Sequence, residues 1–193
     1  MSYVLAFAPW IVYSVIPASQ WRWGALAALA VCAATLVPSI VRRRPASALM
    51  IQIGSAAFFV ATVALAFADP HTALHPYMPA AASLWLALIS WFSLAVRQPF
   101  TLGIARLSTP REIWHQPMFI RTNVIITLFW ALSFTVGGAL LATCAAAHAG
   151  TTVTVVVQIA SFVVPIVFTT RYVAAVQARV AKLRAAADAA PGR

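Results

Sequence analysis

One short stretch of the chain carries an acid and a base at a spacing that could support proton transfer. Glu112 and His115 are three residues apart, so on a helix they would share one face, as a general acid–base pair requires. The same stretch, Thr109-Pro110-Arg111-Glu112, has the form of a capping box with proline at the first helical position. Because capping would already employ the carboxylate, we favour a capping Glu112 and an interfacial His115. We therefore expect no catalytic residue.

Three amide side chains form a second group of candidates, because amides inside hydrocarbon need hydrogen-bond partners. Gln52, Asn123 and Gln158 lie in or beside apolar runs. Pairing between helices is the default interpretation, and the lining of a polar cavity is the alternative. Gln52 and Asn123 lie near the same side of the predicted bundle and could meet across helices. No Asp, Glu, Lys or Arg lies near the middle of an apolar run, which argues against a proton-coupled mechanism.

The loop at 69–75 holds one carboxylate and two imidazoles, ligands that zinc or copper would accept. A stable site normally needs three or four ligands with defined geometry, and Asp69 also suits a turn before Pro70. Cys32 and Cys144 lie singly inside apolar stretches, without the close spacing of a metal-binding pair. We therefore expect neither a metal site nor a cofactor.

Hydrocarbon is the solvent that the composition predicts for most of this chain. Hydrophobic residues make up 63% of the 193 residues and charged residues 8%, whereas a soluble domain is about a quarter charged. The apolar residues fall into six runs, at 2–18, 23–41, 46–68, 79–96, 122–147 and 151–170. A helix needs about 20 residues to cross a ~30 Å core, and the first run is short and contains Pro9 and Pro17. The sequence therefore predicts an all-α, polytopic transmembrane helix bundle of five or six spans within residues 1–170.

The distribution of charge predicts how this bundle is oriented. Of 13 basic residues, twelve follow the second, fourth and sixth runs, and only Arg22 lies on the other side. This bias is typical of the positive-inside rule and predicts cytoplasmic termini for a multi-pass membrane protein. A net charge of +10 would suggest nucleic acid in a soluble protein. Here we expect anionic lipid headgroups, and no nucleic acid, to face the basic residues.

The connection at 97–123 is the most informative part of the sequence. After the box that begins at Thr109 we expect a short helix, which Pro117 ends. Together with the apolar residues around it, this helix makes the connection an amphipathic segment that lies on the inner headgroup layer. Its candidates for contact with lipid or a protein partner are Arg97, Arg106, Arg111, Glu112, Trp114, His115 and Arg121.

The basic tail at 171–193 is expected to continue the last span as a helix. Apolar residues recur in it at spacings of three and four, which gives an a/d stripe: Val173, Val176, Val180, Leu183 and Ala187. Contact with the membrane surface and pairing of helices in a homo-oligomer are both open interpretations of this stripe.

Short motifs of this chain resemble the bacterial intracellular septation protein A family. The opening Phe7-Ala8-Pro9-Trp10-Ile11-Val12-Tyr13 looks like the start of that family, and Arg97-Gln98-Pro99-Phe100 resembles its basic exit from a span. The residues that resemble its next span are Trp114, Asn123, Trp130 and Phe134. The chain departs from the family pattern at Met118-Phe119-Ile120-Arg121 and in its Ala-rich tail. The resemblance implies a small inner-membrane protein of cell-envelope maintenance and division that acts through protein partners, with no catalytic residue to transfer.

Two other functions stay open on the residues alone. A small-solute or lipid transporter would place the three amides in a water-accessible pocket at mid-depth. A membrane enzyme acting on a lipid or isoprenoid would join His115 to the membrane interior by a cleft. A scaffold would show neither feature, and its amides would pair with neighbouring helices.

Overall fold

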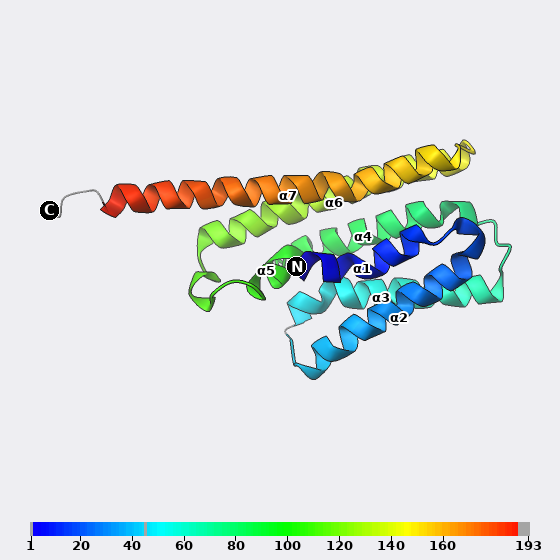
Figure 1. The fold of residues 1–193 in the computed structure, drawn as a ribbon, viewed down its shortest axis with the longest axis horizontal. Helices are drawn as coiled ribbons and strands as arrows, with labels where there is room; N and C mark the ends of the chain where they lie inside the picture. Colours follow the sequence, from blue (N-terminus) through cyan, green and yellow to red (C-terminus); the bar gives the residue numbers. More distant parts are fainter. Residues whose placement is uncertain (1, 45, 189–193) are drawn as a thin grey trace.

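The structure is a computed structural model that describes residues 2–44 and 46–188, and its regular elements in these ranges are all helical. Seven α-helices follow in chain order (Figure 1): α1 (Ser2–Val15), α2 (Trp21–Val41), α3 (Ala46–Ala68), α4 (Met78–Ala95), α5 (Phe100–Arg106), α6 (Pro117–Ala146) and α7 (Thr151–Asp188). Short 3₁₀ turns lie at Ala18–Gln20, His75–Tyr77 and Arg111–Ile113. The expected all-α bundle is confirmed.

Five of the described helices are long and apolar enough to cross a membrane, namely α2, α3, α4, α6 and α7. The remaining long candidate, α1, has 14 residues and is about 21 Å long, short of a ~30 Å hydrocarbon core. It ends at Val15 because Pro17 disfavours a helical conformation in the residue before it. Phe7 and Trp10 of α1 are nevertheless buried in the core. The chain is thus a multi-pass membrane protein with five long helices and a shorter one packed among them.

Two adjacent glycines set the spacing of three helices. α6 packs against α4 and α7, while α3 packs against α2 and the short α5 (Figure 1). A Cβ at Gly137 would overlap the side chain of Ser161 in α7, and a Cβ at Gly138 would lie 2.7 Å from Leu84 of α4. Small residues allow such close approach between membrane helices, where dispersion contacts replace the hydrophobic effect as the force for association.

Four indole N–H groups join neighbouring helices by hydrogen bonds. A buried indole needs an acceptor, and inside hydrocarbon another helix has to supply it. The bonds run from Trp10 to the Ser55 hydroxyl (2.8 Å), from Trp85 to the Gly54 carbonyl (2.9 Å), from Trp91 to the Thr135 hydroxyl (3.1 Å) and from Trp130 to the Thr169 hydroxyl (3.0 Å). They link α1 with α3, α3 with α4, α4 with α6 and α6 with α7.

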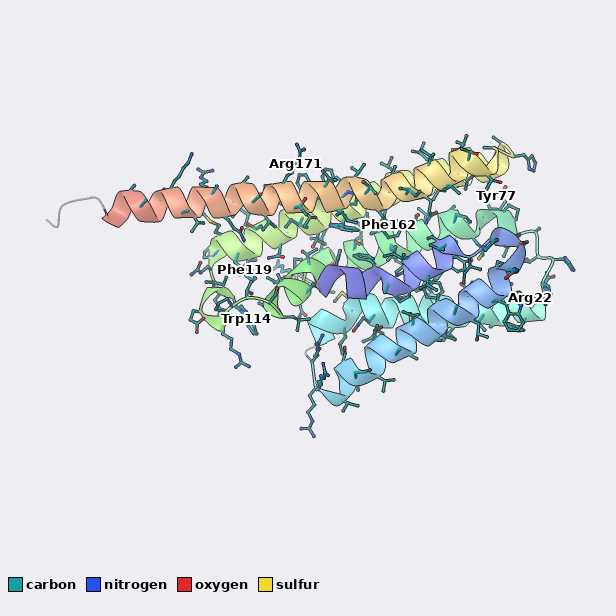
Figure 2. All side chains as sticks on the ribbon, in the orientation of Figure 1. Arg22, Tyr77, Trp114, Phe119, Phe162 and Arg171 are labelled. Carbon is teal, nitrogen blue, oxygen red and sulfur yellow. The ribbon has the colours of Figure 1, made fainter. Side chains whose placement is uncertain are left out.

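Basic residues gather at one end of the bundle, which we call the basic end. Residues 42–44, the connection 97–116 and the part of α7 that begins at Arg171 lie there, as the alternation of the long helices requires. Figure 2 shows Trp114 at this end and Arg22 with Tyr77 at the opposite one. The structure thereby brings together the connections that the sequence assigned to one side.

One helix bound differs from the expectation, and another agrees with it. Pro117 does not end a helix but begins α6, because proline lacks the N–H that the first helical position leaves unpaired and its φ suits that position. The last span and the tail form one continuous helix of 38 residues, about 57 Å long. Its final turns extend past the other helices (Figure 1), so the helical tail is confirmed as far as Asp188. Residues 189–193 of the predicted tail lie outside the described ranges.

Candidate functional site

The connection between α4 and α6 begins with an arginine in a left-handed conformation. Arg97 has φ 55°, its N–H donates to the Leu94 carbonyl at 3.0 Å, and the Gln98 N–H donates to the Ser93 carbonyl at 2.9 Å. This pair of bonds is the Schellman motif, which ends a helix. Glycine usually occupies the left-handed position of this motif. A residue with a Cβ pays about 1–2 kcal/mol for the left-handed conformation. The Arg97 side chain is exposed at the basic end.

The next element, α5, is buried, which contradicts the expectation of a surface segment along the whole connection. Residues 100–104 are all buried. The Phe100 ring makes edge contacts with Phe7 and with Trp130, both at 6.4 Å between centroids. Three aromatic side chains from α1, α5 and α6 therefore meet in the core, and only the part of the connection after α5 lies at the surface.

Hydroxyl groups fasten α5 to its neighbours. The Ser93 hydroxyl accepts from the Phe100 N–H at 3.2 Å and so satisfies a backbone donor at the start of α5. Thr101 donates to the Asn123 carbonyl at 2.9 Å, and its oxygen lies 2.7 Å from that of Thr127. All these groups are buried, so water cannot form hydrogen bonds with them. The bonds within the protein satisfy them instead.

The capping box at Thr109 is not formed, and the predicted role of Glu112 is wrong. The Thr109 hydroxyl donates backwards to the Ala105 carbonyl at 2.9 Å, so it caps the end of α5. Only a 3₁₀ turn follows, and no side-chain hydrogen bond caps it. Glu112 and His115 are both exposed, and no hydrogen bond joins them within this fully described segment. Neither a capping role nor an acid–base pair is supported for these two residues.

A basic and aromatic cluster lies directly after α5. The indole N–H of Trp114 donates to the Thr109 carbonyl at 3.1 Å, which holds the ring over the end of that helix. The guanidinium carbons of Arg106 and Arg111 lie 5.5 and 5.7 Å from the centre of the ring. Both distances fit cation–π contacts. The Nε of Arg106 is buried and has no hydrogen-bond partner among the described residues. We call Arg106, Arg111 and Trp114 the Trp114 cluster.

The Trp114 cluster is chemically suited to bind an anion at the membrane surface. Two guanidinium groups repel one another, and the nearest carboxylate in sequence, Glu112, is exposed. A phosphate would relieve that repulsion and would accept from the unpaired donors, since guanidinium matches phosphate with two parallel bonds. An indole also favours the headgroup region. Arg121 is exposed near the start of α6, at the same end of the bundle.

The three amides do not pair across helices in the way that sequence reasoning expected. Asn123 is 3% exposed, and its Nδ2 donates to the Phe119 carbonyl of its own helix at 2.9 Å. The Oε1 atoms of Gln52 and Gln158 are buried without a hydrogen-bond partner among the described residues. No bond joins Gln52 to Asn123 there. The indole and hydroxyl groups described above link the helices instead. The sequence analysis did not single them out, and the signal that could have found them is the presence of tryptophans within apolar runs.

An open-sided groove of about 480 Å³ lies between α3 and α4. It is almost entirely apolar and is lined by Met50, Ile53, Gly54, Leu88, Ile89, Phe92 and Gln98. None of the three candidate amides lines this groove. Its polar end is Gln98, the residue after the left-handed Arg97.

The loop between α3 and α4 has the turn that the sequence predicted. The Asp69 carboxylate accepts from the His71 N–H at 3.3 Å. The His75 ring packs on Trp21, with 5.0 Å between ring centres. Among the described residues, no three His, Cys, Asp or Glu side chains come together as a metal site would require.

Comparisons with known proteins add no identification. No family model matches this chain, and neither a curated protein nor a solved structure matches it. The fold and the basic end therefore define a class, a multi-pass helical membrane protein, and the functional argument rests on the chain's own residues.

Proposed function

We propose that this chain is a bacterial inner-membrane protein, with both termini in the cytoplasm, that supports the cell envelope by binding lipid and protein partners. The observation that carries the proposal is the Trp114 cluster, in which Arg106 and Arg111 converge on one indole at the basic end. Such a cluster suits the binding of phosphate at the membrane surface. The proposed function requires binding alone and no catalysed reaction.

The twelve-to-one bias of basic residues supports the proposed orientation. Cytoplasmic loops of inner-membrane proteins are enriched in arginine and lysine, and the cytoplasmic leaflet is rich in anionic lipid. With the basic end in the cytoplasm, the Trp114 cluster and the extended end of α7 face the same aqueous compartment. A protein partner on that side would meet both surfaces.

The residues that carry the resemblance to the septation family have structural roles in this fold. Trp130 and Phe134 are in the core, the Asn123 carbonyl receives the Thr101 hydroxyl, and Trp114 organises two arginines. The residues that carry the resemblance therefore shape the bundle and its basic end. This fits a protein that acts by contact.

The proposal is tested by complementation in a bacterium that lacks the gene for this chain. The double variant Arg106→Gln, Arg111→Gln is expected to reach the membrane in normal amount but to fail to restore normal cell length and resistance to detergent. The matched control, Arg22→Gln at the opposite end, should restore both. Full restoration by the double variant would rule out a role for the Trp114 cluster.

One observation favours a second candidate, a small-solute transporter. The buried, unpaired Oε1 atoms of Gln52 and Gln158 could accept from a polar solute that passes between the helices. Uptake into vesicles that contain the purified protein, lost on replacement of either glutamine while the protein stays folded, would support this alternative.

A further inference from the structure

Within residues 2–44 and 46–188, three residues with side chains adopt the left-handed conformation, each at the end of a long helix. They are Arg43 after α2, Arg97 after α4 and His148 after α6, with φ of 50°, 55° and 49°. Each ends its helix with the same pair of backbone bonds, in which the next residue donates to a carbonyl five positions back. Glycine would occupy these positions without strain. A side chain that stays there despite the strain needs a compensating interaction.

The protein itself offers Arg97 little compensation. Asp69 lies at the opposite end of α3, and Glu112, which is at the basic end, is exposed in the turn Arg111–Ile113. The Arg97 side chain is exposed at the basic end. An interaction with the end of the α4 dipole is available to it, but that effect is weak at exposed positions. An anion from outside the chain could interact with this exposed guanidinium.

The groove between α3 and α4 reaches Gln98, the residue that follows this arginine in the sequence. Gln98 forms one end of the groove, and Ile53, Leu88 and Phe92 give it apolar walls. These three side chains are half exposed, at 50%, 57% and 57%, on a surface that faces hydrocarbon. The floor is set by Gly54, where a Cβ would overlap Ile89, so the two helices approach closely beneath the groove.

An apolar groove, with an exposed arginine adjacent in sequence to its polar end, suits the two parts of one amphipathic molecule. We propose that this groove binds one acyl chain of an anionic phospholipid, whose phosphate contacts the guanidinium of Arg97. The groove volume lies in the range of small-molecule sites, and its apolar walls suit a hydrocarbon chain. The inference requires only the membrane-spanning fold, so it stands or falls separately from the proposed envelope role and from the Trp114 cluster.

The test uses the full chain in phosphatidylcholine vesicles that contain a small fraction of phosphatidylglycerol with a photoreactive acyl chain. After illumination, mass spectrometry should find the lipid on peptides that contain Ile53, Leu88 or Phe92. The same photoreactive chain on phosphatidylcholine should label these peptides at least about fivefold less, as expected for one arginine near the headgroup. Equal labelling by the two lipids would overturn the proposal.

Glycine variants separate lipid binding from folding. Arg97→Gly should raise the midpoint of thermal unfolding, because it removes the left-handed strain, and should lower labelling by the anionic lipid to the level of phosphatidylcholine. Arg97→Asn, which also tolerates this conformation, should lower labelling in the same way. The matched control His148→Gly should raise the midpoint without changing labelling. Unchanged labelling of Arg97→Gly would contradict the role of this arginine.

A bulky side chain in the groove tests whether the acyl chain binds there. Ile53→Trp should fill the groove from an exposed position and therefore leave the core intact. Labelling of the groove peptides by the anionic lipid should then fall. Labelling that persists at the same peptides would show that the acyl chain lies elsewhere and would overturn the proposal.

Discussion

Thr101 of α5 and Thr127 of α6 place their hydroxyl oxygens 2.7 Å apart in a fully buried position. The bond explains why a seven-residue helix can be stable inside the bundle. α5 is too short to form alone, since isolated helices below about 12–15 residues are marginal. Its stability has to come from its neighbours, and Thr101 supplies two contacts with α6 while Phe100 joins the aromatic core.

We predict that Thr101→Val destabilises the protein although the two side chains have nearly the same shape. The variant loses the donor to the Asn123 carbonyl and the partner of Thr127, and water cannot replace them. Hydrogen bonds between membrane helices are worth about 0.6 kcal/mol on average and rarely above about 1.7 kcal/mol. Unfolding in mixed micelles of increasing dodecyl sulfate content measures the loss.

The control for this experiment is Thr170→Val. Its hydroxyl is exposed and donates to the Val167 carbonyl of its own helix, so we expect a change within about 0.5 kcal/mol. Equal stability of Thr101→Val and the unmutated protein would mean that the Thr101–Thr127 contact does not hold α5 in place.

Gly137→Ala should destabilise the contact between α6 and α7. The added Cβ would overlap the side chain of Ser161, and relief of that overlap has to move one helix. Overpacking of this kind typically costs about 1–3 kcal/mol. Gly150→Ala is the matched control, because no atom lies within 4 Å of a Cβ at that position. A thermal unfolding midpoint for Gly137→Ala equal to that of Gly150→Ala would contradict the close approach.

Hydropathy predicted the long spans well, because the bilayer requires long apolar helices whatever their neighbours are. The run at 46–68 coincides with α3. The count of spans stayed at five or six because the sequence could not decide how Pro17 would shorten α1. Local patterns cannot carry that information, since the burial of Phe7 depends on α5 and α6.

The connection at 97–123 was harder to predict because its polar groups have several partners within reach. The Thr109 hydroxyl could serve the helix before it or the one after it, and the structure selects the Ala105 carbonyl. Pro117 can end one helix or begin another, and the strength of the following apolar run decides the outcome. Asn123 has a carbonyl of its own helix as a local alternative to any partner on α3. Thr109 and Asn123 both took a carbonyl four residues earlier in the chain, a local partner that the sequence pattern did not rank above the alternatives.

The proposed orientation predicts which positions react with a thiol reagent added outside intact cells. In a variant with Cys32→Ala and Cys144→Ala, a cysteine at Thr72 should be labelled. Cysteines at Ser108 and Ala186 should react only after the membrane is opened. The physical reason is the bias of basic residues toward the cytoplasmic side. Labelling of Ser108→Cys in intact cells would show that the proposed topology is inverted.

The last prediction concerns Gln52, whose Oε1 is buried without a partner. An unsatisfied buried acceptor costs about 1–3 kcal/mol, so Gln52→Leu should leave the stability unchanged or raise it, and Gln158→Leu should behave in the same way.

If the glutamines are only packing residues, both variants should also restore normal cell length in the complementation experiment. If they line a path for a solute, both should stay folded and lose function, because the acceptor that the solute needs has gone. We expect the first result, because the groove that opens between α3 and α4 excludes both glutamines and the helices are joined by indole and hydroxyl groups. Stable variants without function would establish the transporter instead.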